Sequence, residues 1–391
     1  TEIARRGIGK VVLLERDTAV GGIPRHCGHS PFGMREFRRI LSGTAYAARL
    51  EAAALAAGVR ILVRHSVLCC RDGLVTAATP DGLRTFRARR IVLATGARET
   101  SRAGRLVSGD RPIGVINTGA LQNYVHQQHL APFRRPVIVG TELVSMSAIL
   151  TCRSGGIRPA AIIEEAARPT VRFPFHLLPH LAGIPVFYGT RIVDINGRPR
   201  VEAVTVETGT ARQEIVCDGI IFTGRFTPES SLARLSGITI DAGSGGPSVD
   251  VYGRTSDPHI FAVGNLLRPI ETAGWCWAEA KNIAAGVVAD LKGELPTAED
   301  RLSVETGPGI KLVVPQMLDH ASVPRALSSL QLRLLAPAKG RLAMSDGTRE
   351  LWSRPIDSRP ERRILIPLGD LKIGSSVHQL TISVTDQERR A

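Results

Sequence analysis

Short apolar runs bounded by glycine, proline or an acidic residue recur along this chain of 391 residues. Lys10–Glu15, Arg90–Ala94 and His259–Val263 are mostly apolar at consecutive positions, which is the pattern of strands buried on both faces of a parallel sheet. Glu2–Arg6, ahead of Gly7, is typical of the last turns of a helix. The chain therefore opens with a helix that leads into a buried strand.

Further helix and strand signals alternate after these runs. A helix is predicted at Ala45–Ala57, after a glycine-rich loop at Gly21–His29, and a strand at Arg60–Arg64. Leu74–Thr79 and Leu83–Arg87 flank Pro80-Asp81-Gly82 and predict a hairpin. This order of elements is that of a βαβ unit with an inserted β-structure.

A second unit of the same kind begins at Pro136–Gly140, a strand that runs directly into a helix at Leu143–Ser154. The strands expected after that helix are Ala160–Ile163, a meander of Arg191–Ile195, Val201–Glu207 and Gln213–Cys217, and a buried strand at Gly219–Thr223. The sequence thus predicts an α/β protein of two interleaved Rossmann-like three-layer domains.

The C-terminal part changes character after a long alanine-rich helix at Glu271–Lys292. Short β-type runs separated by proline and glycine predict a small C-terminal β-sandwich; the runs are Ile310–Val314, Gln331–Leu335, Arg363–Pro367 and Gln379–Val384. We expect four segments: a first part of one nucleotide-binding domain at 1–112, a second nucleotide-type domain at 113–244, the rest of the first domain at 245–300, and the sandwich at 305–391.

The charge of the chain does not change this picture. The net charge is +14, and 44 of the 50 basic residues are arginine, spread over the whole length. No basic run is interleaved with aromatic residues, so we expect no nucleic-acid partner.

Cysteines and apolar stretches bear on the cellular compartment of the protein and on whether it crosses a membrane. The six cysteines lack the spacing of zinc or iron–sulfur ligands, so we expect reduced, mostly buried thiols and no metal. No apolar stretch reaches the roughly 18–20 residues that cross a bilayer, and the first residues do not form a signal peptide. We therefore expect a cytoplasmic protein without a transmembrane segment.

Three strand ends carry candidate binding chemistry. Glu15 closes the first strand, where an acid can accept ribose hydroxyls or can equally be a solvated strand end. Ala94-Thr95-Gly96 and Val263-Gly264-Asn265 each end a buried strand in small residues, which lets backbone pass close to a flat ligand. The order of the three favours a dinucleotide site.

With Thr223-Gly224-Arg225, these motifs resemble the two-dinucleotide-binding-domain flavoproteins of the glutathione-reductase type. Gly21–His29 and Glu271–Trp277 look most like the FAD-containing alpha subunits of opine oxidase, hydroxyproline dehydrogenase and hydrogen cyanide synthase. The resemblance implies FAD as cofactor. The positions it assigns to FAD are Glu15, Arg16, Gly22, Ile23, His26, Cys27, Ala94, Thr95, Gly96, Gly264, Asn265, Thr272 and Ala273.

Two of these segments have alternative interpretations. His26 and Cys27 either lie over the isoalloxazine or belong to a loop packed against the adenine side. The N–H groups at Thr272–Gly274 would point at the flavin, while Trp275 and Trp277 either contact it or fill the core.

Three positions depart from that family. The family's first strand and G-x-G-x-x-G turn, which hold the FAD pyrophosphate, are missing from this sequence, and Asn265 stands where the wider family has Asp. In the second nucleotide turn, Gly140–Ser145, Glu142 replaces a glycine and adds bulk and negative charge. NAD(P) binding is therefore doubtful.

These observations favour an FAD-dependent oxidoreductase, or the flavin subunit of an amino-acid, opine or polyol dehydrogenase that relays electrons from a C–H donor or a partner subunit. A lone Cys27 disfavours a dithiol mechanism, and no catalytic acid or base can be assigned. The expected partners are a small-molecule donor and a second flavoprotein subunit or a ferredoxin-like protein in a hetero-oligomer. The alternatives are an NAD(P)H:acceptor flavin reductase and a truncated, non-catalytic structural subunit.

Overall fold

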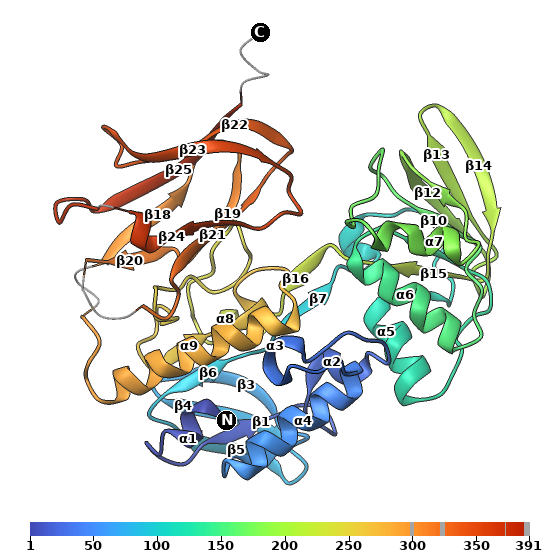
Figure 1. Ribbon diagram of the computed structural model, residues 1–391. Helices are drawn as coiled ribbons and strands as arrows, with labels where there is room; N and C mark the ends of the chain where they lie inside the picture. The colour runs from blue at the N-terminus through green and yellow to red at the C-terminus, as the bar shows by residue number, and fades with distance from the viewer. Residues whose placement is uncertain (298–300, 321–324, 372, 387–391) are drawn as a thin grey trace. The chain divides into compact units, whose positions relative to one another are not determined.

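The computed structural model describes residues 1–297, 301–320, 325–371 and 373–386 (Figure 1). They form two compact units. The first unit contains Thr1–Val20, Ala52–Ala97 and Pro228–Ala391, and the second contains Gly21–Glu51 and Arg98–Thr227. The limits of the four expected segments stay a prediction; residues 298–300 and 387–391, at the ends of two of them, lie outside the described residues.

Parallel strand pairs form the nucleotide-type part of the first unit. β1 (Val12–Leu14) pairs with β2 (Arg60–Leu62), and β6 (Ile91–Leu93) pairs with β17 (Ile260–Ala262). β17 is apolar at all three positions and fully buried, as its consecutive apolar residues predict. Ile283 and Val287 of α9 (Ala273–Leu291) lie in the same core cluster, so this helix covers the β6–β17 pair.

β1 and β6 belong to two separate two-stranded sheets in the described part of the chain. Each strand has a hydrogen-bonded partner strand on one edge only, and Val12, Leu13 and Val92 are exposed. The prediction that these two strands are buried on both faces is therefore wrong at these positions, because a pair of strands covers less of its own surface than a full sheet does. α1 (Glu2–Arg5) precedes β1, as the sequence indicates.

The remaining elements of this part are short. A meander of β3 (Ser66–Arg71), β4 (Leu74–Thr79) and β5 (Gly82–Arg87) contains the expected hairpin plus one strand that the sequence did not predict. α4 (Gly43–Ala56) runs from the second unit into the first, and α8 (Ser231–Leu235) packs near β3. β7 (Ala97–Glu99) pairs with β16 (Phe226–Pro228) where the chain passes between the units.

A five-stranded sheet forms the centre of the second unit. Its spatial order, with all its strand pairs parallel, is β11 (Val186–Phe187), β10 (Ala161–Ile163), β9 (Pro136–Val139), β15 (Gly219–Phe222) and β8 (Val115–Asn117). Ile138, Ile162 and Ile221 point to a core that they share with the helices. Their strand neighbours point to the opposite core, because side chains alternate along a strand.

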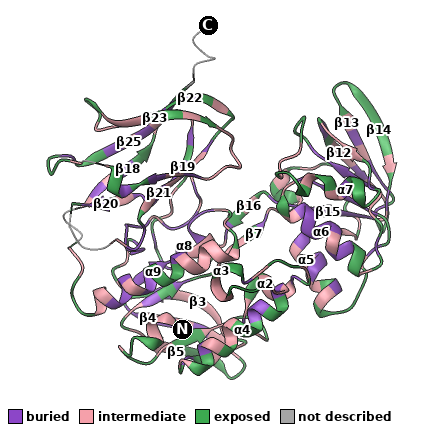
Figure 2. Cartoon of the chain, viewed as in Figure 1, coloured by how far each residue is buried: buried purple, intermediate pink, exposed green. Residues whose placement is uncertain are grey.

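Each face of this sheet is covered by a different layer. α5 (Thr118–Gln122) and α6 (Leu143–Ser154) pack on one face, with α7 (Leu178–Leu181) beside α6. The other face carries the predicted meander of β12 (Thr190–Asn196), β13 (Ala203–Thr208) and β14 (Ala211–Val216). Figure 2 shows β14 as its most exposed strand. The predicted three-layer α/β class is confirmed.

The C-terminal sandwich has more strands than the sequence predicts. One sheet has the order β20 (Met317–Asp319), β18 (Arg301–Thr306), β25 (Gln379–Asp386), β22 (Ala338–Ser345) and β23 (Glu350–Ser358). The other has the order β19 (Ile310–Val314), β21 (Ser329–Leu334) and β24 (Ile364–Pro367). β18, β20, β22 and β23 were not predicted. In β22, for example, one of the three inward positions is Gly340, which weakens the apolar alternation.

β19 connects the sandwich to the nucleotide-type core of the same unit. Ile310 and Val313 lie in the sandwich core, whereas Leu312 and Val314 lie in the core formed by β6, β17 and α9. One strand therefore contributes apolar side chains to both cores.

Two local expectations differ from the structure. The segment expected to be a loop at Gly21–His29 contains α2 (Gly22–His26), followed later by α3 (Met34–Phe37). Gly21 and Gly22 both have positive φ, which lets the chain turn sharply into this helix. The long helix begins at Ala273 rather than Glu271, because Glu271 is held in a non-helical turn by bonds described below.

Candidate functional site

The carboxyl ends of β6 and β17 lie side by side and place two predicted motifs together. Leu93 is paired with Ala262, and Val263 N–H donates to Leu93 O at 3.1 Å. Ala94-Thr95-Gly96 and Gly264-Asn265 follow directly. In doubly wound α/β folds, ligands bind outside this end of a parallel sheet. The structure therefore brings together Ala94, Thr95, Gly96, Gly264 and Asn265.

Gly96 and Gly264 present open backbone at this edge. Gly96 has φ +74° and Gly264 has φ +80°, a region that favours glycine. A Cβ added to Gly96 would meet nothing within 4 Å, and one on Gly264 would only touch Cys276. Thr95 Oγ1 donates to Glu229 O at 2.7 Å, and Glu229 N donates to Gly96 O at 2.8 Å. The backbone is thus anchored on one side and open on the other, which fits a flat ligand.

Glu15 ends β1 in the same unit. It is half-buried, and its Oε1 accepts the N–H of Asp17 at 3.0 Å. Arg16 beside it is exposed. One carboxylate oxygen thus orients the side chain while the other can accept hydroxyl groups, which is the requirement for a ribose acceptor.

The start of α9 follows the β17 motif after a short turn. Thr272 is the N-cap residue, and Ala273 is the first helical residue. The first N–H groups of a helix have no acceptor within it and carry partial positive charge. Thr272 and Ala273 therefore lie where an anionic or electron-rich ligand edge would be stabilised.

Asn265 binds the turn that leads to α9. Its Oδ1 accepts Glu271 N–H at 2.8 Å, and its Nδ2 donates to Glu271 O at 3.0 Å. This reciprocal pair requires both an acceptor and a donor on one side chain. The wider family has an Asp at position 265. An Asp could accept the Glu271 N–H but could not donate to Glu271 O, so it could make only one of these two bonds.

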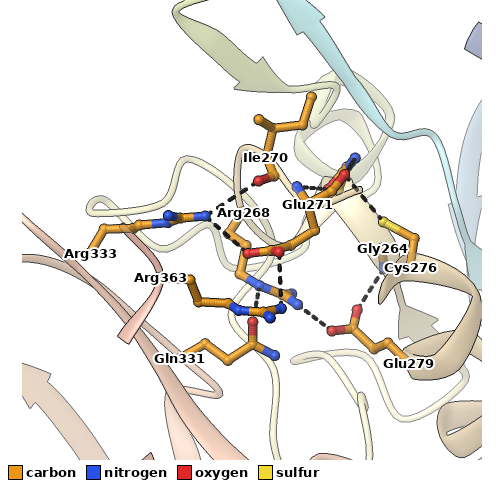
Figure 3. Close-up of polar contacts among 10 residues, drawn as sticks. Gly264, Arg268, Ile270, Glu271, Cys276, Glu279, Gln331, Arg333 and Arg363 are labelled. Carbon is orange, nitrogen blue, oxygen red and sulfur yellow. Dashed lines mark hydrogen bonds and ion pairs between the residues drawn. The ribbon is translucent and has the colours of Figure 1, made fainter. Parts of the chain in front are cut away.

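A buried charge cluster surrounds the same turn (Figure 3). Arg268 and Glu279 form an ion pair with side chains only 4% and 6% exposed, and Glu279 Oε1 accepts Gly264 N–H at 2.9 Å. Glu271 accepts from Arg333 and Arg363, each at 3.0 Å. The sequence reasoning missed this cluster, because Arg333 and Arg363 are 62 and 92 positions from Glu271 and no local pattern marks them.

Gly22, Ile23, His26 and Cys27 belong to the second unit, whereas the strand-end residues belong to the first. Ile23 is exposed, and His26 Nε2 lies 3.2 Å from Arg25 Nη2. Cys27 is buried, with Sγ 3.5 Å from Gln122 Oε1. The assignment of these four residues to FAD stays a prediction.

The thiols nearest the predicted motifs are protonated at neutral pH. Burial raises the pKa of Cys27 to about 11 and that of Cys276 to about 12. All six cysteines are free, and four of them are buried. A thiolate is the reactive form of cysteine, and both Cys27 and Cys276 are neutral thiols at pH 7. Neither is therefore activated for thiol–disulfide exchange.

The side chain of Glu142 fills the second nucleotide turn, which lies between β9 and α6. Glu142 Oε2 accepts from Ser145 Oγ at 2.6 Å and lies 2.8 Å from Thr223 Oγ1. A Cβ on Gly140 or Gly224 would overlap the Glu142 carboxylate. The carboxylate therefore lies over the glycines through which backbone would approach a pyrophosphate.

Two further buried acids lie around this turn. Glu99 accepts the N–H groups of Gly119 at 2.8 Å and Gly224 at 3.2 Å, and burial raises its pKa. Burial likewise raises the pKa of Glu164, whose carboxylate accepts the Thr141 hydroxyl. Glu99 was missed by the sequence reasoning, since an isolated acid after a strand carries no distinguishing pattern.

Comparisons with known proteins agree with this geometry. A model of the family described as pyridine nucleotide-disulphide oxidoreductase matches residues 4–280. The nitric oxide reductase FlRd-NAD(+) reductase of Vibrio vulnificus (strain YJ016) is 26% identical over 194 residues, 46% of this chain and 47% of that protein. The sarcosine oxidase subunit alpha of Rhizobium meliloti (strain 1021) is 30% identical over 192 residues, 45% of this chain and 18% of that protein.

A solved structure shows the same fold. The thioredoxin reductase of T. acidophilum superposes with a TM-score of 0.60 at 19% identity, covering 75% of this chain and 92% of that one. The chain spans less than half the length of the two curated relatives it matches.

Open glycines at parallel strand ends, next to a helix N-terminus, are the arrangement of dinucleotide-binding folds, and the family match makes this chain an FAD-dependent oxidoreductase. The chain belongs to the pyridine nucleotide-disulphide oxidoreductase family. Among the described residues, no helix is both long and apolar enough to cross a membrane.

Proposed function

We propose that the first unit binds FAD at the carboxyl ends of β1, β6 and β17, and that the protein oxidises a C–H bond of an amino-acid-like or polyol substrate or relays electrons for a partner subunit that does. The observation that carries the proposal is the pair of open glycines, Gly96 and Gly264, beside the start of α9. Their missing side chains leave room for a flat ring system against backbone.

The residues at this edge fit FAD in chemical terms. Glu15 would accept hydroxyls of the adenosine ribose, Gly96 and Gly264 would line the dinucleotide, and the N–H groups at Thr272 and Ala273 would face its electron-rich end. A glycine-rich turn for the pyrophosphate is not among the described residues. When bound, FAD supplies the electron-accepting chemistry, and the protein groups position it and set its potential.

The choice of electron donor rests on Glu142 and on a relative. The Glu142 carboxylate lies over Gly140 and Gly224 and would repel a pyrophosphate in the second nucleotide turn. The sarcosine oxidase alpha subunit, by its name, belongs to an enzyme that oxidises an amine and has further subunits. Both observations favour a carbon-centred donor or a partner subunit over NAD(P)H.

A second candidate is an NAD(P)H:acceptor flavin reductase. It is favoured by the name of the Vibrio vulnificus relative, an NAD(+) reductase, and by the complete five-stranded parallel sheet of the second unit. This candidate requires that NAD(P)H displace or bypass the Glu142 carboxylate.

The test is anaerobic reduction of the FAD-loaded protein by two panels of donors. One panel contains secondary amines, N-alkyl amino acids and polyols, and the other contains NADH and NADPH. Bleaching of the flavin absorbance by a member of the first panel, with little bleaching by the second, is the expected result. Bleaching by NADH alone would replace the first candidate by the second, and failure to bind FAD would leave only a non-catalytic role.

A further inference from the structure

The C-terminal sandwich supplies two arginines to the turn that leads into α9. Arg333 lies on β21, and Arg363 immediately precedes β24. They approach the two carboxylate oxygens of Glu271, whose side chain is only 7% exposed, each at 3.0 Å. Arg333 Nη2 also lies 3.3 Å from Ile270 O, so the sandwich binds both the side chain and the backbone of this turn (Figure 3).

A second contact from β21 reaches the other end of the turn. Gln331 Oε1 accepts from Arg268 Nε at 2.8 Å, and Arg268 is in turn paired with Glu279 of α9. Gln331 and Arg333 are two positions apart on one strand and therefore share a face. Two neighbouring side chains of β21 thus hold residues on either side of Ile270.

Residues of the nucleotide-type core also hold this turn, through Asn265 and Glu279. Asn265 pairs with both backbone groups of Glu271, and Glu279 accepts the N–H of Gly264. The turn Gly264–Thr272 is therefore fixed at its beginning by Asn265 and Glu279 and at its end by Arg333 and Arg363.

Charge and stacking strengthen the link to α9. The cluster contains three arginines, Arg268, Arg333 and Arg363, against two glutamates, Glu271 and Glu279. Arg363 also stacks over Trp275 in the first turn of α9, with its Cζ 3.8 Å from the ring centre. Its guanidinium can meet a carboxylate edge-on and an aromatic face at once, which a lysine cannot do equally well.

We propose that the sandwich is a positioning element of the flavin site, and that Arg333 and Arg363 fix the turn Gly264–Thr272 and the start of α9 against the ligand edge. This inference rests on the proposed function. It gives the sandwich a role in binding and tuning the cofactor that the fold alone does not assign. The shared strand β19, which packs into both cores, connects the strands that carry these arginines to the core beneath α9.

The test compares the variants Arg333→Gln and Arg363→Gln with the unaltered protein. Arg341→Gln is the matched control. Arg341 lies on β22 of the same sandwich and pairs with Glu350 on the exposed surface. Hydrogen exchange measures the protection of amides 264–276, and fluorescence titration measures FAD affinity. Networks of this kind modulate the affinity of a coupled site by about 2- to 30-fold.

We expect Arg333→Gln and Arg363→Gln to speed exchange at 264–276, to weaken FAD binding at least about threefold and to shift the reduction potential of the bound flavin, with Arg341→Gln unchanged. If a glutamine variant fails to fold, Arg333→Lys and Glu271→Gln replace it. Each keeps part of the hydrogen bonding but loses the paired geometry of a guanidinium against a carboxylate. Lysine should rescue Arg333 better than Arg363, which also stacks on Trp275.

Unchanged exchange, affinity and potential in folded variants would overturn the inference. If the unaltered chain binds no FAD, the proposed function fails, and with it the cofactor part of this inference. The exchange result would still decide whether the sandwich holds the turn.

Discussion

The carboxylate of Glu142 lies over Gly224 so closely that a Cβ on that glycine would overlap Glu142 Oε1. Gly224 follows β15, and Glu142 precedes α6, so the two meet across the turn where a Rossmann-type domain receives a pyrophosphate. The second unit thus has the parallel sheet of a nucleotide-binding domain, with the Glu142 carboxylate over the two glycines of this turn.

We predict that NADH and NADPH are poor reductants of the flavin, and that Glu142→Gly raises their affinity about tenfold or more. Like charges about 4 Å apart repel by roughly 1–4 kcal/mol, depending on the local dielectric. Stopped-flow reduction at varied NADH measures the effect, and Glu142→Gln separates charge from bulk. Flavin bleaching that saturates at micromolar NADH in the unaltered protein would refute this interpretation of the turn.

Asn265→Asp should destabilise the first unit. An Asp can still accept Glu271 N–H, but it cannot donate to Glu271 O, and its charge lies beside that carbonyl. The expected loss in free energy of unfolding is about 1–3 kcal/mol, measured by urea denaturation. Asn123→Asp is the control, since Asn123 Oδ1 accepts from Gln128 at an exposed position and Asp keeps that acceptor. Equal losses in both variants would contradict the assigned role of Asn265.

The raised pKa of Glu99 predicts a pH-dependent stability. Burial disfavours its charged form, so the folded protein holds this proton at pH values where the unfolded chain, near 4.5, has released it. The free energy of unfolding contributed by Glu99 therefore falls as pH rises from 4.5 through the folded-state pKa. Urea unfolding from about pH 4.5 to about pH 8 should show a decline that Glu99→Gln reduces. An identical pH profile in the variant would be inconsistent with a raised pKa.

Adding a strand and a glycine-rich turn ahead of Thr1, about 20–30 residues long, should increase FAD affinity. β1 and β6 each have a strand partner on one edge only, so each has an edge at which a further strand can pair. The turn would supply N–H groups and a helix N-terminus for the pyrophosphate. Equilibrium dialysis should show at least about a tenfold gain. An extension with its glycines replaced by valine is the control, and an equal gain with that control would exclude pyrophosphate binding as the cause.

The sequence predicted the layers of the fold because consecutive apolar residues, as in Ile260–Ala262, and alternating ones, as in Val204 and Val206, mark strands whose side chains are buried. The strand-end motifs were predicted for the same reason, since they follow such runs. The same apolar pattern overstated burial at Val12, Leu13 and Val92, which lie in two-stranded sheets. The charge cluster at Glu271 was not predictable, because its arginines come from strands 62 and 92 positions away. The sequence marked Asn265 as a departure from the family's Asp, but it did not predict the two bonds that this side chain makes to the backbone of Glu271.

Helix and strand limits were less predictable where polar contacts override local pattern. The helix expected from Glu271 begins two residues later because Asn265, Arg333 and Arg363 hold Glu271 in the preceding turn. β22 and β23 were missed because small or polar side chains interrupt their apolar alternation.

The most direct test of FAD binding at the ends of β6 and β17 is the dissociation constant of FAD for Gly96→Val and Gly209→Val. Both glycines have positive φ and open space where a Cβ would lie, so the backbone strain of the two substitutions is matched. A side chain on Gly96 would occupy the space of the ligand, whereas Gly209 lies in the turn between β13 and β14. We predict that FAD binds at least about tenfold more weakly to Gly96→Val and with unchanged affinity to Gly209→Val. Equal affinities in the two variants would contradict the site.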